Sequence, residues 1–310
     1  MSYRIVAYIT AYSDKTALER CIASLQCQTY SIEKILIVDN SPHVLLSPEE
    51  LDESIIVKSY PQNIGISGGL RVGIEWSIKN EFDFIWTFDQ DTEPSPDALK
   101  RLIETYDNLK EAHQKIGIIA PLPVDRVTGQ QWNGMILDKY QLKQFLINDQ
   151  IPEIYKCDAV ITAGSLISIQ AAYNTPFPNE NLFIEAVDWE YCLKLKKQNY
   201  SIFVNRNIVL KQRFGETQEV NLFYPKIKIM RLNCSPLRYY YRCRNNTFVE
   251  LSLAMENKLL IMFSIHRIKI MINLVIKILL LENLSRRLKI WACLRGTYDG
   301  FRGNLGKTWV

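Results

Sequence analysis

Two aspartates, one residue apart, follow an apolar run and are the first candidates for chemistry in this chain. Residues 84–88 read Phe-Ile-Trp-Thr-Phe and lead directly into Asp89-Gln90-Asp91. Such a run predicts a buried strand, and open α/β sheets bind ligands at the carboxyl edge of their strands. Side chains at i and i+2 of an extended segment point the same way, so the two carboxylates can hold one hard divalent cation. The alternative interpretation is a solvated turn that binds nothing.

The segments that would position these aspartates alternate between strand and helix. Residues 4–10 are predicted to form a strand, residues 35–38 are an uninterrupted apolar run, and between them Asp14 caps a stretch with the helical period. Continuous apolarity indicates that both faces of the sheet are covered, so we expect a mainly parallel α/β sheet flanked by helices. Further strands are predicted near residues 55–57, 116–120, 159–169 (broken by Gly164) and 202–210, and helices near residues 72–79, 97–112, 188–198, 235–245 and 259–281.

A glycine-rich stretch precedes the second predicted helix and contains Asn63, Gly65, Gly68, Gly69 and Arg71. Its spacing does not match Gly-x-Gly-x-x-Gly, which argues against a dinucleotide-binding fold. Two interpretations stay open. The loop contacts a nucleotide, or the glycines let the start of a helix pack closely on its neighbours.

Three carboxylates, Glu185, Asp188 and Glu190, gather around the start of the helix predicted to end near residue 198. Helix N-termini favour acidic residues, which is a sufficient explanation for Asp188 and Glu190. The preference of helix N-termini does not explain Glu185, which lies before the predicted helix and directly after the apolar residues 182–184. A general base for a hydroxyl group is the chemical role that such a carboxylate offers.

The basic charge of the chain is concentrated at its C-terminal end. The 310 residues carry a net charge of +4, but residues 258–310 contain ten Lys or Arg against Glu282 and Asp299. Basic residues interleaved with apolar runs suit an anionic membrane surface better than nucleic acid, for which we find no motif. Charges interrupt residues 259–281, so we expect no helix there that spans a bilayer.

The cysteines and the first residues bear on the compartment. The seven cysteines have irregular spacings, which favour reduced thiols over a disulfide framework or a zinc site. The chain opens with a predicted strand and not with a secretory signal, so we expect a cytoplasmic protein.

With these motifs together, the sequence resembles the family 2 glycosyltransferases with a GT-A fold, and most closely their bacterial rhamnosyltransferase-like branch. The resemblance covers about residues 3–250, with a weaker similarity at residues 296–300. Residues 10–12 are similar to the family's first nucleotide loop, residues 38–41 to its base-binding motif, and residues 89–91 to its metal-binding Asp-x-Asp.

The resemblance implies a set of site residues. The nucleotide sugar would contact Thr10, Ala11, Tyr12, Asp39, Asn63, Gly65, Gly68, Arg71, Asp89, Gln90 and Asp91. The acceptor would contact Trp132, Gly164, Ser165, Trp189 and Glu190. Asp188 would be the catalytic base, with Glu185 beside it. Asp91, Asp89 and Gln212 would hold Mg²⁺ or Mn²⁺, although Gln212 stands where the branch usually has a histidine.

The resemblance also implies an organisation and a reaction. Residues 1–230 would form the catalytic domain, with a nucleotide-sugar half to about residue 120 and an acceptor half after it, and residues 231–310 a basic amphipathic helical extension. The reaction would be inverting transfer of L-rhamnose from dTDP-rhamnose to a lipid-linked saccharide of surface polysaccharide or O-antigen synthesis, at the inner face of the plasma membrane.

Several alternatives are left open by the sequence. The donor could be a UDP-sugar that carries galactofuranose, glucose or galactose, and Gln212 raises the alternative of a non-catalytic sugar-binding homologue. A nucleotidyltransferase would need a glycine-rich triphosphate loop, and residues 11–14 contain no glycine. The C-terminal helices could instead pack on the catalytic domain or on a partner subunit, as in a homo-oligomer.

Overall fold

The computed structural model describes residues 2–47, 52–112, 114–126, 128–138, 141–145, 151–212, 217–222, 227–232, 234–256, 259–282 and 284–309. The chain forms two compact units. Unit 1 contains residues 1–136, 144–180 and 187–212, and unit 2 contains residues 137–143, 181–186 and 213–310.

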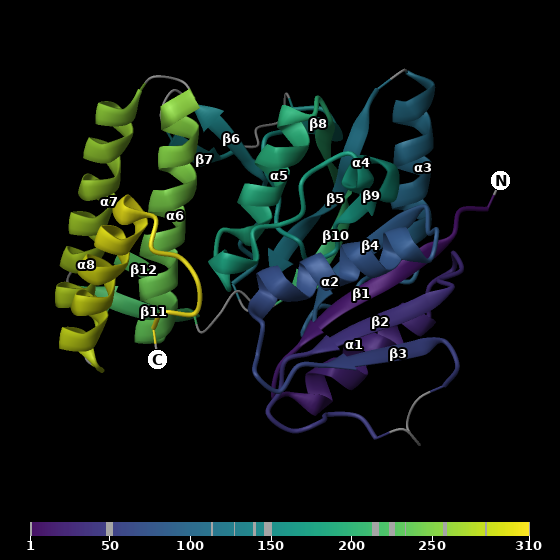
Figure 1. Ribbon diagram of the computed structural model, residues 1–310, viewed down its shortest axis with the longest axis horizontal. Helices are drawn as coiled ribbons and strands as arrows, with labels where there is room; N and C mark the ends of the chain where they lie inside the picture. The colour runs from purple at the N-terminus through teal and green to yellow at the C-terminus, as the bar shows by residue number, and fades with distance from the viewer. Residues whose placement is uncertain are drawn as a thin grey trace. The chain divides into compact units, whose positions relative to one another are not determined.

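Unit 1 is built on one eight-stranded sheet with the strand order β3-β2-β1-β4-β9-β5-β10-β8 (Figure 1). Neighbours are parallel except that β9 runs antiparallel to β4 and β5, and β8 antiparallel to β10. The predicted mainly parallel sheet is therefore confirmed. The strands are β1 (Ile5–Ala11), β2 (Lys34–Asp39), β3 (Ile55–Ser59), β4 (Phe84–Asp89), β5 (Ile116–Asp125), β8 (Ile154–Cys157), β9 (Leu166–Ser168) and β10 (Ser201–Gln212).

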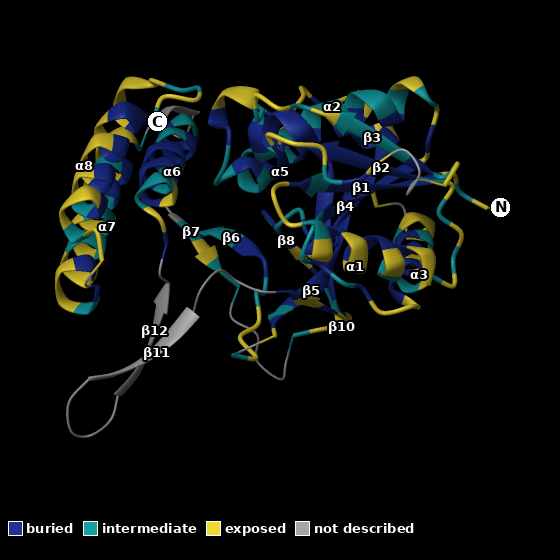
Figure 2. Ribbon diagram, turned by 90° about the horizontal axis from the view of Figure 1, so that it is seen from below, coloured by how far each residue is buried: buried dark blue, intermediate teal, exposed yellow. Residues whose placement is uncertain are grey.

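Helices cover both faces of this sheet, and its central strands β1 and β4 are accordingly buried along almost their whole length. Ala7 and Ile9 of β1 share a core with Leu18 of α1 and Leu102 of α3, whereas Tyr8 points to the opposite face and α2. Figure 2 shows the central strands as buried. The helices of unit 1 are α1 (Lys15–Gln26), α2 (Gly65–Lys79), α3 (Ala98–Glu111), α4 (Ile169–Tyr173) and α5 (Val187–Lys197), and a 3-10 turn spans Glu180–Leu182 at its boundary with unit 2.

The close packing of α2 on β1 depends on glycine. A Cβ atom at Gly69 would lie 2.6 Å from the Tyr8 hydroxyl, and one at Gly73 would lie 2.6 Å from the Tyr8 ring. At the start of the helix, Gly65 has a left-handed φ of +72°, which glycine adopts without strain. The packing interpretation of the glycine-rich stretch therefore accounts for these positions.

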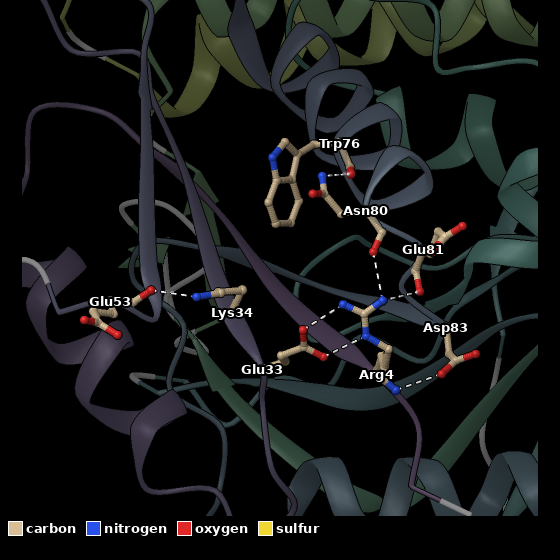
Figure 3. A network of polar contacts seen from close by, with 8 residues as sticks. All are labelled: Arg4, Glu33, Lys34, Glu53, Trp76, Asn80, Glu81 and Asp83. Carbon is tan, nitrogen blue, oxygen red and sulfur yellow. Dashed lines mark hydrogen bonds and ion pairs between the residues drawn. The ribbon is translucent and has the colours of Figure 1, made fainter.

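An arginine fastens the amino edge of the sheet (Figure 3). The Nε and NH2 groups of Arg4 donate to the Glu33 carboxylate over 2.9 and 2.8 Å, and NH1 donates to the carbonyls of Asn80 and Glu81 over 3.0 Å. The Arg4 backbone N–H donates to Asp83 over 2.8 Å. These contacts join the starts of β1, β2 and β4, at the edge opposite to Asp89.

The strand predicted over residues 159–169 is wrong in part. Only Leu166–Ser168 is extended as β9, and Ile169–Tyr173 forms α4. Residues 162–165 instead donate to and accept from β4 as an irregular turn, in which Gly164 has a φ of +74°. That conformation is strained for residues other than glycine, and it interrupts the strand predicted over residues 159–169.

Unit 2 is mainly helical in the residues that the structure describes. Its helices are α6 (Pro236–Glu256), α7 (Leu260–Leu281) and α8 (Arg286–Arg302), its hairpin consists of β11 (Thr217–Leu222) and β12 (Ile227–Leu232), and β6 (Met135–Asp138) pairs with β7 (Gln141–Gln144). None of the helices in these described stretches is long and apolar enough to cross a bilayer.

The α6 and α8 backbones touch because two glycines of α8 face α6. A Cβ atom would lie 2.3 Å from the Tyr240 carbonyl oxygen at Gly296, and 2.4 Å from the Arg244 carbonyl oxygen at Gly300. The similarity noted at residues 296–300 therefore falls on a helix contact. Two buried ion pairs add to this core, Arg267–Glu250 at 3.3 Å and Lys289–Glu282 at 2.5 Å.

Candidate active site

The sheet register brings the predicted nucleotide residues to one edge. In the parallel ladders Ala11 pairs with Asp39, and Thr10 pairs with Asp89. Thr10 and Ala11, predicted to lie in a loop, are the last two residues of β1. The carboxyl ends of β1, β2 and β4 therefore meet where ligands of α/β sheets bind.

The loops above this edge are fixed by carboxylate and amide side chains. Asp39, which is buried, accepts from the backbone N–H groups of Ser41 over 2.9 Å and Leu45 over 3.1 Å. Asn63, with a left-handed φ of +54°, accepts from the N–H of Gly65 over 2.9 Å. These side chains shape the loops, which gives them a role that does not require a ligand.

The Asp-Gln-Asp segment is tied to the end of β1 by its middle residue. The Gln90 amide donates to the Tyr12 carbonyl over 2.9 Å and accepts from the Tyr12 N–H over 2.7 Å. Because its amide is used in this way, Gln90 acts as a support between two loops. The Tyr12 side chain is 54% exposed and offers a ring for stacking.

Arg71 of α2 is engaged by carboxylates. Its Nε lies 2.8 Å from Glu75 and its NH1 lies 3.2 Å from Glu180. It also lies over the Phe177 ring, 5.6 Å from the centroid. A nucleotide phosphate would have to compete with these two carboxylates for Arg71. Gly68, one helical turn earlier, is packed against the Ile64 side chain.

The charges of three carboxylates act on the Cys21 thiol. Burial, together with the negative charges of Asp91, Asp89 and Glu93, raises the pKa of the Cys21 thiol well above its ordinary value. Glu93 is paired with Arg126 at 2.9 Å and Arg20 at 3.4 Å. Asp89 and Asp91 are partly exposed at the carboxyl end of β4, whereas Glu93 is engaged by the two arginines.

The end of β10 reaches the same segment. The Thr92 hydroxyl donates to the Gln212 amide oxygen over 3.5 Å, and Glu93 forms a β-bridge with Lys211. Gln212 is buried and lies next to the residue that follows Asp91, although 120 positions separate it from Thr92 in the chain. Gln212 therefore lies beside the segment that carries Asp89 and Asp91.

This donor set fits a hard divalent cation. Two carboxylates and an amide oxygen are the kinds of ligand that Mg²⁺ and Mn²⁺ accept. Across the described ranges there is no group of three or more His, Cys, Asp or Glu side chains that could complete a metal site. A cation held by the aspartates would therefore complete its coordination with oxygens of the bound diphosphate.

Asp188 begins α5 and is connected to β4 through Thr162. The Thr162 hydroxyl donates to Asp188 Oδ1 over 3.3 Å, and the Thr162 carbonyl accepts from the Thr87 hydroxyl over 2.5 Å. Thr87 lies two residues before Asp89 on the same strand. Sequence reasoning missed Thr162, and the only signal was its position two residues before Gly164.

The predicted acceptor residues around Gly164 have roles in the fold. A Cβ atom at Gly164 would lie 2.8 Å from Leu210. The Ser165 hydroxyl is buried and donates to the Ile161 carbonyl over 2.6 Å. The half-buried Trp132 donates its backbone N–H to Pro123 over 2.9 Å. Ser165 therefore supports the turn and does not present a free hydroxyl.

The acids on either side of Asp188 have basic partners. Glu190 accepts from Lys194 over 2.5 Å and from the Asn179 N–H over 3.2 Å, and its neighbour Trp189 is half-buried. Glu185, in unit 2, accepts from Arg238 over 2.9 Å and from Arg242 over 3.2 Å.

The environment of Glu185 makes it a weak base. Burial opposes its ionisation, but the charges and hydrogen bonds of Arg242 and Arg238 outweigh burial and hold the pKa of Glu185 below its ordinary value. Glu185 and Ala186 have left-handed φ angles of +62° and +61°, and the Asn245 amide donates to the carbonyl of Glu185 over 2.9 Å. Glu185 therefore holds a strained segment, which leaves Asp188 as the candidate base.

Comparison with known proteins identifies the family. The model of the family described as glycosyl transferase family 2 matches residues 7–169, which is more than half of the chain. The chain belongs to glycosyl transferase family 2. The match includes the ends of β1, β2 and β4 and the Thr162 turn, so the resemblance noted in the sequence is confirmed.

Individual relatives of this glycosyltransferase extend along most of its length. It is 24% identical over 312 residues to dTDP-rhamnosyl transferase RfbF of Shigella flexneri, covering 99% of this chain and 98% of the relative. The S. aureus TarS 1-349 structure is similar with a TM-score of 0.54 and 13% identity over 96% of this chain and 80% of that one.

A second solved structure, GalNAc-T7 with UDP, GalNAc and Mn²⁺, has a TM-score of 0.54 and 12% identity. It covers 69% of this chain, which spans only 44% of that one. These likenesses establish the GT-A fold, as predicted.

We expect Glu185→Gln to destabilise this glycosyltransferase by about 1–3 kcal/mol at pH 7, because two guanidinium groups lose a charged acceptor. The folded pKa of Glu185 is depressed, so its contribution is present above the unfolded value near 4.5 and is lost as the pH falls through the lower folded value. Urea unfolding at pH 7 and below pH 4.5 should show the difference between the two proteins shrinking in acid.

The matched control is Glu104→Gln, which breaks an exposed pair with Lys100 at 3.9 Å and should change stability little. Equal unfolding free energies for wild type and Glu185→Gln at pH 7 would contradict the role of Glu185 in holding its segment.

Proposed function

We propose that this glycosyltransferase moves L-rhamnose from dTDP-rhamnose to a saccharide hydroxyl with inversion. The observation that carries the proposal is the connection of Asp188 through Thr162 to β4, the strand that ends in Asp89. The similarity to the Shigella relative along nearly the whole chain supports the choice of donor. The division into a catalytic domain to residue 230 and a helical extension stays a prediction.

In the proposed reaction Asp188 accepts the proton of the acceptor hydroxyl as that oxygen attacks the anomeric carbon. The bond from this carbon to the diphosphate oxygen breaks on the opposite face, and the diphosphate leaves with the electron pair. A general base contributes roughly 100- to 10,000-fold to such a rate. The bond from Thr162 to Asp188 keeps this carboxylate in a fixed orientation.

Asp89 and Asp91, with Gln212 behind Thr92, are the residues that would hold Mg²⁺ or Mn²⁺. When bound, a divalent cation neutralises charge on the leaving diphosphate. The Tyr12 ring, placed by Gln90, is available to stack on the nucleotide base. The backbone of Lys211 forms a β-bridge with Glu93 beside this site. Arg213 lies outside the described residues.

We further propose that the acceptor is lipid-linked and that unit 2 docks on an anionic membrane. α7 carries an exposed apolar row at helical spacing, and α8 also exposes apolar side chains. The α7 row consists of Ile261, Ile265, Ile268, Ile272, Ile276 and Leu279, and the α8 side chains are Leu294, Tyr298 and Phe301.

The charges on this surface favour an anionic partner. Exposed basic residues accompany the apolar rows: Lys269, Lys277, Arg287, Arg295, Arg302 and Lys307. In the described residues from 259 to 309 both carboxylates, Glu282 and Asp299, are buried. A second copy of this surface would place like charges together, whereas anionic lipid attracts each basic residue by about 1 kcal/mol.

We expect Asp188→Asn to bind dTDP-rhamnose as the wild type does and to transfer the sugar roughly 100- to 10,000-fold more slowly, because an amide cannot take the proton. Calorimetry with the donor and a transfer assay separate the two effects. The control Glu104→Gln removes an exposed carboxylate from α3. Transfer by Asp188→Asn at the rate of the control would place the base elsewhere.

Two substitutions test the metal site. Asp91→Ala should weaken metal-dependent binding of dTDP, because a hard oxygen ligand is lost. Gln212→His should raise the apparent affinity for Mn²⁺ more than that for Mg²⁺, since imidazole suits transition metals. Calorimetric titration of each ion in the presence of dTDP measures both. Unchanged curves for Asp91→Ala would remove that aspartate from the site, and unchanged curves for Gln212→His would remove residue 212.

Membrane docking predicts that the protein co-sediments with phosphatidylglycerol vesicles at low salt and not with phosphatidylcholine vesicles. The double variant Ile265→Glu, Ile272→Glu should lose this binding, because it places carboxylates in the apolar row of α7. Val44→Glu, at a side chain 62% exposed in unit 1, is the matched control. Equal sedimentation of all three proteins would contradict docking through α7.

A further inference from the structure

Unit 2 contains a pocket of about 440 Å³ that the proposed transfer does not use. Its walls come from α8, from Tyr240 of α6 and from the segment that follows α8. Aromatic rings and polar groups share these walls: Tyr240, Trp291, Trp309, Arg295, Asp299 and Asn304.

The pocket is built by helical spacing and by a chain reversal. Trp291, Arg295 and Asp299 are four residues apart and lie on one side of α8. After the helix the chain turns back and is pinned by Arg244, whose NH1 donates to the Gly306 carbonyl over 2.5 Å and to the Thr308 hydroxyl over 3.0 Å. The walls are therefore fixed before any ligand arrives.

A buried carboxylate organises the polar groups. Asp299, 3% exposed, accepts from the Tyr240 hydroxyl over 2.8 Å, from Arg295 Nε over 2.9 Å and from the Asn304 amide over 3.2 Å. Within this network Arg295 uses Nε, and Asn304 uses its nitrogen. The terminal guanidinium nitrogens and the amide oxygen are the groups that the network does not engage.

The charge and the rings together define the ligand class. One arginine and one aspartate cancel, so the walls do not favour an anion such as phosphate. Trp309 stacks near Tyr240 with ring centroids 4.8 Å apart, and Trp291 is 55% exposed. Aromatic faces pack against the C–H face of a sugar ring, and planar amide and guanidinium groups pair with its hydroxyls.

We propose that this pocket binds a neutral saccharide, at a site separate from the reacting residues Asp91 and Asp188 of unit 1. The inference does not depend on the donor or on the catalytic base. It gives unit 2 a saccharide-recognition role in addition to membrane docking.

The test is saturation-transfer NMR of the full chain, without nucleotide or vesicles, with methyl α-L-rhamnoside and N-acetyl-D-glucosamine as probes. We expect transfer to at least one probe and about tenfold weaker binding for Trp291→Ala, the loss typical of a truncated aromatic anchor. Asn304→Ala should weaken binding as well. Leu288→Ala, an exposed site on the same helix outside the pocket, should bind as the wild type does.

The assay contains no donor and measures no transfer, so a failure of the proposed catalysis leaves this result unaffected. The proposal is overturned if neither saccharide shows saturation transfer, or if Trp291→Ala binds like the Leu288→Ala control. Displacement of the sugar by inorganic phosphate at equal concentration would also overturn it, because the site would then be an anion site.

Discussion

The structure depends on how the turn at residues 162–165 is attached to β4. The Thr87 hydroxyl donates to the Thr162 carbonyl, the Gly164 N–H donates to the Thr87 carbonyl over 2.7 Å, and the Trp86 indole donates to the Gly164 carbonyl over 2.9 Å. Through Thr162, these bonds connect Asp188 of α5 to β4, the strand that ends in Asp89. The fold thereby links a candidate base to a candidate diphosphate site with side chains that need not touch the substrate.

Within unit 2, α6 also binds the segment that precedes Asp188 in the chain. Arg238, Arg242 and Asn245 of α6 bind residues 184 and 185, next to the left-handed backbone at Glu185 and Ala186. Such strained conformations persist when surrounding contacts maintain them. α6 is in turn fixed by the backbone contact with α8 that Gly296 and Gly300 permit. α6 therefore contacts backbone groups that lie three residues before Asp188 in the chain.

The sequence by itself determined the parallel core and the family. The apolar runs in β1, β2 and β4 indicate a sheet that is covered on both faces. The acidic residues that come directly after these runs could therefore be assigned to the strand ends from sequence. The helical stripe on α7 and the basic charge around it were also readable, since both are properties of local sequence.

Only the tertiary structure decided which candidate residues are already used by the fold. Gln90 and Glu185 have side chains suited to ligands, yet each is bonded to a group that is distant in sequence. Ser165 and Asp39 are bonded to backbone groups of nearby residues, a use that their residue types alone do not reveal. Gln212 meets Thr92 because β10 ends beside β4's loop, across 120 residues. Residue type and spacing state what a side chain can do, but its partners depend on long-range packing, which periodicity does not encode.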